Sequence, residues 1–453
     1  MKNTSIEQIA QILEIPNPSG SLQITGCQID SRNVCPGDLF FALKGEKVDG
    51  HQFLAEARSR GASAAIVDQE YEGPDHGLIL LPVGSVMEGL QRLARFEIEN
   101  NGIRIVGITG SVGKTTTKDF LTEILKAKYR VGKTPQNYNT KLTLPLSVLN
   151  RDGGEEVLVL EMGMSEPGDI GRLLQIAQPE VAVVTKIALA HAGAFPNGLV
   201  DIAKGKAEIF SSAKLKSAIF DHGLTEYPEA MGLIPIEKRV SFSLENRSAD
   251  YFFSAADGKN WVDERGVRAY QFIEQGIFQQ KHIVHNFLAA IAAARQMKLE
   301  WDEINARIPY LELPKMRFEC WQKQGITYIN DAYNANPESM RAALESLPRP
   351  QEGGKRIGVL GKMAELGPFS EEAHRNVGLI AQKTLDYLLV LGEEAKPLFE
   401  SFREIKKPAE IFTDLPSLAK RLEALISPGD VVLVKGSRVM QMETIFEFLS
   451  LDR

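Results

Sequence analysis

The chain of 453 residues has little of what marks a secreted, membrane or nucleic-acid-binding protein. Its three cysteines, Cys27, Cys35 and Cys320, are too few and too scattered for a disulfide framework or a zinc site, so a reducing cytoplasm is the expected location. No apolar run approaches the roughly 18–20 residues of a membrane helix, and residues 1–15 lack the apolar core of a secretory signal. The net charge of −7, without a basic run, argues against a nucleic-acid partner.

What is present is the composition of a globular protein with several domains. Hydrophobic residues make up 43% of the chain and charged residues 25%, which excludes a disordered, collagen-like or coiled-coil chain. At roughly 150 residues per domain, the length predicts about three domains. From residue 103 onward apolar strands alternate with helices, which is the pattern of a doubly wound parallel sheet, and the alternation repeats after Leu313-Pro314.

The predicted fold is therefore α/β with three domains. We expect a small N-terminal α/β domain over residues 1–101, a central doubly wound, P-loop ATPase-like parallel sheet over 102–312, and a C-terminal Rossmann-like α/β domain over 313–453. The expected strands are 39–43, 64–67, 105–108, 157–160, 181–184, 328–329, 357–360, 387–391 and 431–434. The expected helices are 52–60, 85–100, 114–129, 202–210, 281–297 and 416–426.

A glycine-rich stretch, residues 109–117, joins a predicted strand to a predicted helix, as a phosphate-binding loop does. Glycines let backbone N–H groups turn inward around phosphates, and the helix N-terminus adds partial positive charge. Lys114 would reach the β- and γ-phosphates, and the hydroxyl of Thr115 would bind Mg²⁺. The strict pattern G-x-x-x-x-G-K-[ST] is not met, because Ile108 occupies the position of its first glycine, and a glycine-rich turn with an ordinary surface lysine is the alternative. The residues expected around the nucleotide phosphates are Gly110, Ser111, Val112, Gly113, Lys114, Thr115 and Thr116.

Three more side chains are candidates for a metal site. Glu161 ends the apolar stretch 157–160, at the strand end where open α/β sheets bind ligands. A charged residue that merely ends a strand is the alternative, although the unusual Met162-Gly163-Met164 that follows favours function. Taken alone, His191 is more simply a loop hydrogen-bonding group, and Lys206 a solvated helix lysine.

Residues 109–118 resemble the ATP loop of the Mur peptide ligases, and the resemblance extends over all three predicted domains. The Glu-Met-Gly-Met-Ser string at 161–165 and the Tyr-Asn-Ala-Asn-Pro-x-Ser-Met string at 333–340 resemble the family member that adds a dipeptide, rather than its relatives that add a diamino acid. The other matching segments are 30–32, 36–45, 49–51, 137–139, 145–146, 331–332, 363–367 and 435–438.

This resemblance implies an ATP-dependent amide ligase of peptidoglycan precursor synthesis. Such an enzyme joins D-alanyl-D-alanine to UDP-N-acetylmuramoyl-tripeptide through an acyl phosphate and releases ADP and phosphate. It also implies two Mg²⁺ ions. We further expect no nucleic-acid partner, no membrane span and a monomer. Thr115 and Glu161 would hold the first ion, and His191 and Lys206 the second. Lys206 would be carbamylated by CO₂, which turns an ammonium into the oxygen ligand that Mg²⁺ prefers.

The remaining site residues also follow from the resemblance. Asn286 would contact adenine, while Arg317 and Asp331 would approach the nucleotide phosphate and ribose from the third domain. The residues expected at the UDP end of the substrate are Asp30, Ser31, Arg32 and Lys44. Other expected substrate-binding residues are Asn137, Asn139, Tyr333, Asn334 and Asn336.

The chain departs from the family pattern at four positions. Lys186 replaces an asparagine, Gln280 and Ile283 replace a glycine and an asparagine, and Lys362 replaces an acidic residue. A lysine at 186 would either weaken Mg²⁺ binding by repulsion or substitute for part of its charge. Two alternatives remain open: a sister ligase with a different amine substrate, and a nucleotide-switch protein without ligase chemistry. A switch needs no UDP-sugar domain, so the segment 30–50 argues against it.

Overall fold

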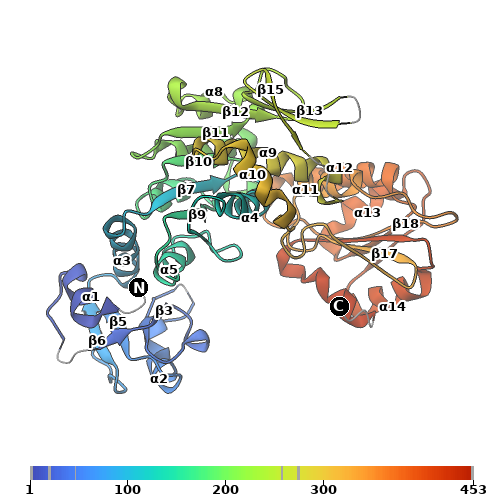
Figure 1. Ribbon diagram of the computed structural model, residues 1–453. Helices are drawn as coiled ribbons and strands as arrows, with labels where there is room; N and C mark the ends of the chain where they lie inside the picture. The colour runs from blue at the N-terminus through green and yellow to red at the C-terminus, as the bar shows by residue number, and fades with distance from the viewer. Residues whose placement is uncertain (1–3, 19–21, 46, 257–258, 273–275, 450–453) are drawn as a thin grey trace.

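The computed structural model describes residues 4–18, 22–45, 47–256, 259–272 and 276–449. Figure 1 shows the N-terminal, central and C-terminal portions as three units, each with its own sheet. No helix among these residues is both long and apolar enough to cross a membrane.

The N-terminal unit contains a four-stranded parallel sheet in the order β3-β4-β5-β6. Its longest helix, α3, is capped by the Ser85 hydroxyl, which accepts a hydrogen bond from the N–H of Glu88. The helix predicted over 52–60 begins as a 3₁₀ turn, Gly50–Phe53, before it becomes α2. The strands are β3 (Gly26–Gln28), β4 (Asp38–Phe41), β5 (Ala64–Asp68) and β6 (Ile79–Val83), with a separate pair β1 (Thr4–Ser5) and β2 (Gln23–Ile24), and the helices are α1 (Ile6–Leu13), α2 (Leu54–Ser59) and α3 (Val86–Asn100).

The central unit is built on a nine-stranded sheet in the order β15-β14-β13-β12-β11-β10-β7-β9-β8. The strands predicted at 105–108, 157–160 and 181–184 are β7, β9 and β10, which lie side by side next to the edge strand β8. Across the sheet from β8 to β13, which includes β7, all neighbouring strands are parallel. The strands β14 and β15 add an antiparallel edge. The strands are β7 (Arg104–Thr109), β8 (Val131–Lys133), β9 (Val157–Glu161), β10 (Val181–Val184), β11 (Ser217–Asp221), β12 (Arg239–Ser243), β13 (Tyr251–Ala256), β14 (Lys259–Glu264) and β15 (Val267–Phe272).

Helices cover both faces of this sheet. One buried cluster joins α4 and α9 to Val106 and Val159, and another joins α5, α6 and α7 to Leu158 and Leu160. The helices are α4 (Lys114–Leu125), α5 (Thr143–Leu149), α6 (Asp169–Leu174), α7 (Leu199–Ala207), α8 (Pro228–Met231), α9 (Lys281–Gln296) and α10 (Trp301–Arg307). Because side chains on both faces are buried, strands such as β10 are continuously apolar.

Two predicted helices have different limits in the structure. The helix predicted over 114–129 ends at Leu125, where the chain tightens into turns with three-residue hydrogen bonds, such as Lys128 N–H to the Leu125 carbonyl. The helix predicted over 202–210 is α7, which starts after Gly198 and gives way to a 3₁₀ turn, Glu208–Ser211. Gly198 has a φ of 58°, a conformation that glycine adopts without strain.

The C-terminal unit has a six-stranded sheet in the order β16-β17-β21-β18-β19-β20. Only β16 is antiparallel to its neighbour, which agrees with the predicted Rossmann-like alternation. The strands are β16 (Glu319–Lys323), β17 (Ile326–Asn330), β18 (Arg356–Gly361), β19 (Tyr387–Leu391), β20 (Ala409–Phe412) and β21 (Val431–Lys435), and the helices are α11 (Pro337–Glu345), α12 (Ser370–Thr384), α13 (Lys396–Arg403), α14 (Leu415–Leu425) and α15 (Ile445–Phe448).

Strand order decides where a ligand can bind. After β7 the chain forms β8 and β9 on one side of it and then crosses to β10 on the other side. Such a reversal opens a crevice at the carboxyl ends of the strands. The phosphate loop and Glu161 both lie at that end.

Candidate functional site

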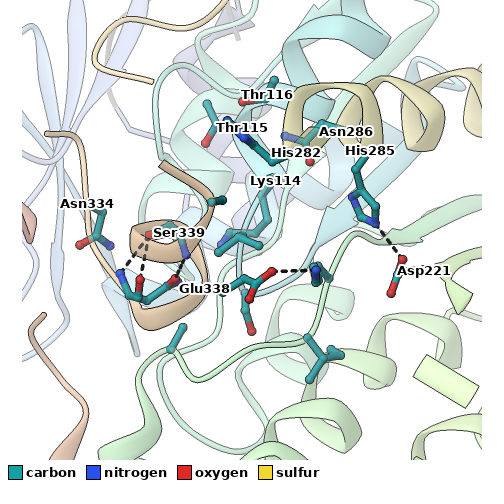
Figure 2. Close-up of a pocket in the computed structure, with 18 of the residues that line it drawn as sticks. Lys114, Thr115, Thr116, Asp221, His282, His285, Asn286, Asn334, Glu338 and Ser339 are labelled. Atoms are coloured by element: carbon teal, nitrogen blue, oxygen red, sulfur yellow. Dashed lines mark hydrogen bonds and ion pairs between the residues drawn. The ribbon is translucent and has the colours of Figure 1, made fainter. Parts of the chain in front are cut away.

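A cavity of about 2040 Å³ lies between the central and C-terminal units. Figure 2 shows residues of both units converging on it, among them Lys114 and Thr115 from the start of α4 and Glu338 and Ser339 from α11. Its volume exceeds the roughly 300–1,000 Å³ of an ordinary small-molecule pocket, so it has room for more than one ligand.

The phosphate loop needs glycine at two of its positions. Gly110 and Gly113 have φ angles of 147° and 84°, which side chains rarely allow. A Cβ atom on Gly110 would lie 1.9 Å from the Thr185 Oγ1, and one on Gly113 would lie 2.1 Å from the Asn286 Oδ1. The loop is therefore packed against β10 and α9, which places Asn286 beside the expected nucleotide position.

Lys114 folds back over this loop. Its Nζ donates a hydrogen bond to the Gly110 carbonyl at 2.9 Å. Burial lowers the pKa of Lys114, Glu161 opposes that effect, and the positive charge of Arg317 adds to it. An anion in the cavity would favour the charged ammonium, which is the form that binds phosphate.

Glu161, only 2% exposed, is held by two side chains. Its Oε2 accepts a hydrogen bond from the Thr115 hydroxyl, and its Oε1 accepts one from the Asn139 amide, both at 2.9 Å. A hydroxyl and a carboxylate are the donors that fit Mg²⁺, which proteins bind through one or two carboxylates together with substrate phosphates. Among the described residues, no three His, Cys, Asp or Glu side chains gather as a metal cage, so phosphate oxygens would have to complete the shell.

Lys118, one turn after Lys114, is a site residue that the sequence analysis missed. Its buried Nζ donates to the carbonyls of Thr134 and Gln136 at 2.8 and 2.7 Å, and it lies 4.0 Å from the Glu161 carboxylate. The position next to Thr117 in the recognised loop was the only signal for it.

His191 connects the two units. It adopts a left-handed backbone conformation with a φ of 55°, and its Nδ1 contacts the Glu365 carboxylate of the C-terminal unit. Burial lowers the pKa of His191, Glu365 acts in the opposite direction, and Lys114 and Lys206 lower it further. The imidazole is therefore biased toward the neutral form, which is the form that binds metals.

Sequence context alone suggested that Lys206 is a solvated helix lysine, but in the structure it is buried. It lies in the last turn of α7 with only 2% of its surface exposed, behind the cavity wall. Among the described residues, its Nζ takes part in no hydrogen bond or ion pair. Burial, then the charge of Lys114, lowers the pKa of Lys206 well below its ordinary value, while Glu161 opposes the shift.

The C-terminal unit brings its predicted residues to the same cavity. The Arg317 guanidinium lies 4.0 Å from the centre of the Tyr333 ring, and its Nη2 is 3.5 Å from the Thr115 hydroxyl. Asp331 pairs with the buried Lys435 at 2.6 Å. Besides the phosphate loop, Glu161 and His191, the predicted residues that line the cavity are Asn137, Asn139, Asn286, Arg317, Asp331, Tyr333, Asn334 and Asn336.

The residues predicted at the UDP end lie elsewhere, in the N-terminal unit outside this cavity. Asp30 and Arg32 form an ion pair at 2.7 Å, and the Ser31 hydroxyl donates to Glu56 at 2.8 Å. Lys44 forms an isolated β-bridge with Asp49. The structure thus separates the predicted site residues into two groups.

The four departures from the family pattern have different surroundings. Lys186 forms an ion pair with Glu338 at 2.7 Å, so its charge is neutralised by a neighbour. Lys362 pairs with Glu394 at 2.7 Å. The remaining two lie at or near the start of α9: Ile283 is buried, and the Oε1 of Gln280 is buried without a hydrogen-bond partner.

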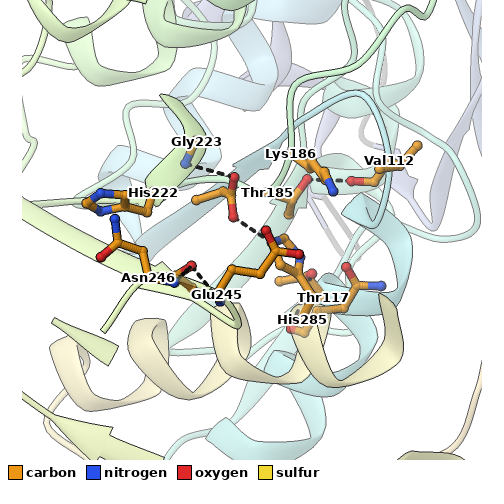
Figure 3. Close-up of polar contacts among 12 residues, drawn as sticks. Val112, Thr117, Thr185, Lys186, His222, Gly223, Glu245, Asn246 and His285 are labelled. Carbon is orange, nitrogen blue, oxygen red and sulfur yellow. Dashed lines mark hydrogen bonds and ion pairs between the residues drawn. The ribbon is translucent and has the colours of Figure 1, made fainter. Parts of the chain in front are cut away.

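A cluster of polar side chains at the far end of the cavity was also missed. His285 of α9 forms an ion pair with Asp221, the last residue of β11, at 2.8 Å. Figure 3 shows His285 near Glu245 and Asn246, with His222 beside Gly223. Asp221, His222, Glu245 and Asn246 come from segments that the sequence analysis assigned to no element. His285 lies in the predicted helix 281–297, but no motif singled it out.

The comparisons with known proteins agree with this architecture. Family models match three segments: "Mur ligase family, catalytic domain" over residues 23–97, "Mur ligase middle domain" over 108–294, and "Mur ligase, glutamate ligase domain" over 316–438. The UDP-N-acetylmuramoyl-tripeptide–D-alanyl-D-alanine ligase of Bacillus subtilis is 31% identical, with 99% of each chain covered. The ligase of the same name from Treponema pallidum is 32% identical, with 96% of this chain and 95% of that protein covered.

Solved structures give the same result. The MurF ligase of Thermotoga maritima, in complex with ADP, superimposes with a TM-score of 0.79 at 32% identity, covering 94% of this chain and 96% of that one. MurF from Acinetobacter baumannii superimposes with a TM-score of 0.82 at 27% identity, with full coverage of both chains. Three consecutive family models and relatives aligned from end to end leave one conclusion: the chain belongs to the Mur ligase family.

Proposed function

We propose that this chain joins D-alanyl-D-alanine to UDP-N-acetylmuramoyl-tripeptide, converting ATP into ADP and phosphate. The main observation in support is that the phosphate loop of the central unit and the 333–336 loop of the C-terminal unit face one shared cavity. A cavity of this kind brings an activated acyl group and its amine acceptor together. The names of the Bacillus and Treponema relatives support this choice of substrates.

The chemistry begins with a carboxylate, which is a poor electrophile. The terminal carboxylate of the tripeptide attacks the γ-phosphorus of ATP, the bond to ADP breaks, and an acyl phosphate forms. The dipeptide amine then attacks the acyl carbon, loses a proton, and phosphate leaves. Lys114 and the N-terminus of α4 would neutralise charge on the transferring phosphoryl group, and Arg317 would approach it from the other side.

Two magnesium sites are part of the proposal. Thr115 and Glu161 would hold one ion, since they already share a hydrogen bond in a buried pocket. His191 and a carbamylated Lys206 would hold the other. Bound Mg²⁺ neutralises phosphate charge, and the protein contributes the oxygen and nitrogen donors that fix its position.

The surroundings of Lys206 support its carbamylation. Only the neutral amine attacks CO₂, forming an N–C bond with loss of one proton, and burial together with the charge of Lys114 favours that neutral form. The resulting carbamate carries a negative charge, which the neighbouring Lys114 and a metal ion would balance. An unmodified ammonium would instead repel the cation.

Further roles are proposed on the basis of the family resemblance. Asn286 contacts adenine and Asp331 the ribose, while the N-terminal unit, residues 1–101, binds the UDP end. Residues 102–312 carry ATP, and 313–453 the acceptor dipeptide. The substrate contacts would be made by Asp30, Ser31, Arg32, Lys44, Asn137, Asn139, Tyr333, Asn334 and Asn336. We further propose a monomer in the cytoplasm, and the three unpaired cysteines support a reducing compartment.

A phosphate-release assay tests the proposed reaction. Turnover should require UDP-N-acetylmuramoyl-tripeptide and D-alanyl-D-alanine together, and each substrate is omitted in turn as a control. Faster product formation from a UDP-muramoyl-dipeptide and a single diamino acid would make this chain a sister ligase. ATP turnover that needs neither substrate would indicate a nucleotide switch.

A further inference from the structure

One ion pair across the cavity joins the central and C-terminal units through two residues that are far apart in the chain. The Nζ of Lys186, in the loop after β10, lies 2.7 Å from Oε1 of Glu338, in the first turn of α11. The two side chains are 37% and 19% exposed. A pair that is partly shielded from water is screened by salt less than one on the open surface.

On the central side, the backbone around Lys186 is fixed to the phosphate loop. The Lys186 carbonyl accepts a hydrogen bond from the Ser111 N–H at 2.7 Å, and the Thr185 hydroxyl donates to the Val112 carbonyl at 2.6 Å. Figure 3 shows Thr185 and Lys186 beside Val112. The Ser111 hydroxyl adds a third link, to the Ala188 carbonyl at 2.7 Å. The backbone at Lys186 therefore moves with the phosphate loop.

On the C-terminal side, Glu338 is fixed to the loop proposed to bind the dipeptide. Asn336 caps α11 by accepting the Ser339 N–H at 2.8 Å, and the Ser339 hydroxyl returns a bond to the Asn336 carbonyl. Arg341 holds the Glu338 carboxylate at 2.6 Å from within the same helix. The carboxylate thus has a fixed position relative to residues 333–336 (Figure 2).

Two other charged contacts between these units use groups that the proposed reaction needs. His191, paired with Glu365, is a proposed metal ligand, and Arg317, beside Thr115, is proposed to approach phosphate. Lys186 and Glu338 have neither role. Their ion pair is therefore a charged contact that can persist when nucleotide and metal are bound.

We propose that Lys186 and Glu338 are positioning residues that form a tether between the phosphate loop and the acceptor-binding loop. The tether sets the distance between the acyl phosphate and the attacking amine, so the inference rests on the proposed function. Misplacement of reacting groups by about 1 Å can reduce a rate by as much as a hundredfold. Neither residue touches the nucleotide in this assignment, so its binding does not depend on them.

The test is a double-mutant cycle on the full-length enzyme. Lys186→Met, Glu338→Gln and the double variant are compared with wild type for kcat, for KM of D-alanyl-D-alanine, and for the dissociation constant of the ATP analogue β,γ-methylene-ATP. Lys362→Met is the matched control, because it breaks an ion pair of the same length, to Glu394, inside the C-terminal unit. Lys186→Arg keeps the charge. Melting curves confirm that each variant is folded.

We expect kcat to fall about tenfold in each single variant and no further in the double variant, because both remove the same interaction. Binding of the analogue should stay within about twofold of wild type, and Lys362→Met and Lys186→Arg should keep most activity. If the losses of kcat multiplied in the double variant, the two residues would act independently and the tether would be overturned. Weaker analogue binding in Lys186→Met alone would also overturn it and make Lys186 a phosphate-binding residue. A Lys186→Met variant that behaves like Lys362→Met would also overturn it.

Small-angle X-ray scattering provides a readout independent of the reaction. Lys186→Met should have a larger radius of gyration than wild type or Lys362→Met, both without ligand and with β,γ-methylene-ATP. Equal radii would contradict the tether. If wild type turned over none of the ligase substrates, the proposed function would fail, and the scattering comparison would still decide whether the tether exists.

Discussion

Replacing Lys206 with methionine separates its chemical role from its packing role. The side chain is 2% exposed, so its methylenes are packed in the interior, and each buried methylene contributes about 0.8 kcal/mol to stability. Alanine would remove three of them, a loss of about 2.4 kcal/mol, whereas methionine has a similar length and stays apolar. Methionine also removes the Lys206 amine, whose charged form is disfavoured by burial. We therefore expect the free energy of unfolding of Lys206→Met to lie within about 1 kcal/mol of that of wild type.

The activity of the Lys206→Met variant should nevertheless be nearly lost, because methionine cannot form a carbamate. Loss of one group that stabilises transition-state charge costs about 3–4 kcal/mol, which is a hundredfold to thousandfold in kcat. If Lys206 were an ordinary surface lysine, its replacement would change the free energy of unfolding by less than about 0.5 kcal/mol and leave the rate intact.

Phosphate release is measured at saturating Mg²⁺ for wild type, Lys206→Met and Lys206→Ala, each with and without acetate. Acetate should restore part of the rate only in the alanine variant, since only that variant leaves space for a small carboxylate. Lys206→Glu should recover poorly, because its shorter side chain does not reach the same position. Wild-type turnover by Lys206→Met would refute the proposed carbamate and the second metal site with it.

Three further predictions follow from the same site. Lys114→Ala should lower kcat by more than tenfold, through loss of the cation that meets the γ-phosphate, and a variant that keeps over a tenth of wild-type kcat in the phosphate-release assay contradicts this. Gly113→Ala should weaken binding of β,γ-methylene-ATP at least tenfold in titration calorimetry, because the new methyl group collides with Asn286; unchanged affinity would show that the loop relaxes freely. Burial lowers the pKa of His282 from 6.5 to about 4. Between these two pH values the unfolded chain therefore binds more protons than the folded one. The free energy of unfolding should fall as pH drops from 6.5 to 4, by at most about 3 kcal/mol. His282→Phe should flatten this part of the acid dependence in thermal melts, and an unchanged pH profile would argue that His282 titrates normally.

Much of the fold could be predicted from local patterns. The run Tyr387–Leu391 is apolar throughout and forms a buried strand with the predicted limits, since a parallel sheet covered on both faces buries every side chain. The Gly-Lys-Thr sequence between a strand and a helix predicted the phosphate loop, because phosphate binding requires glycines and a helix N-terminus at that point. The strand β14 was not predicted, since only Val262 in it is buried and the apolar signal is weak. The largely buried strands β11 and β12 were also missed.

The site itself depends on contacts that no local pattern contains. Sequence context made Lys206 a surface lysine, and only the packing of α7 buries it beside Glu161 and Lys114. Arg317 and Thr115 are 202 positions apart in the chain, yet they lie 3.5 Å apart across the cavity. Local sequence determines backbone conformation because neighbouring residues restrict φ, ψ and hydrogen bonding. Burial, pKa and interdomain ion pairs depend on which surfaces meet after folding, and for that reason only the tertiary structure decided them.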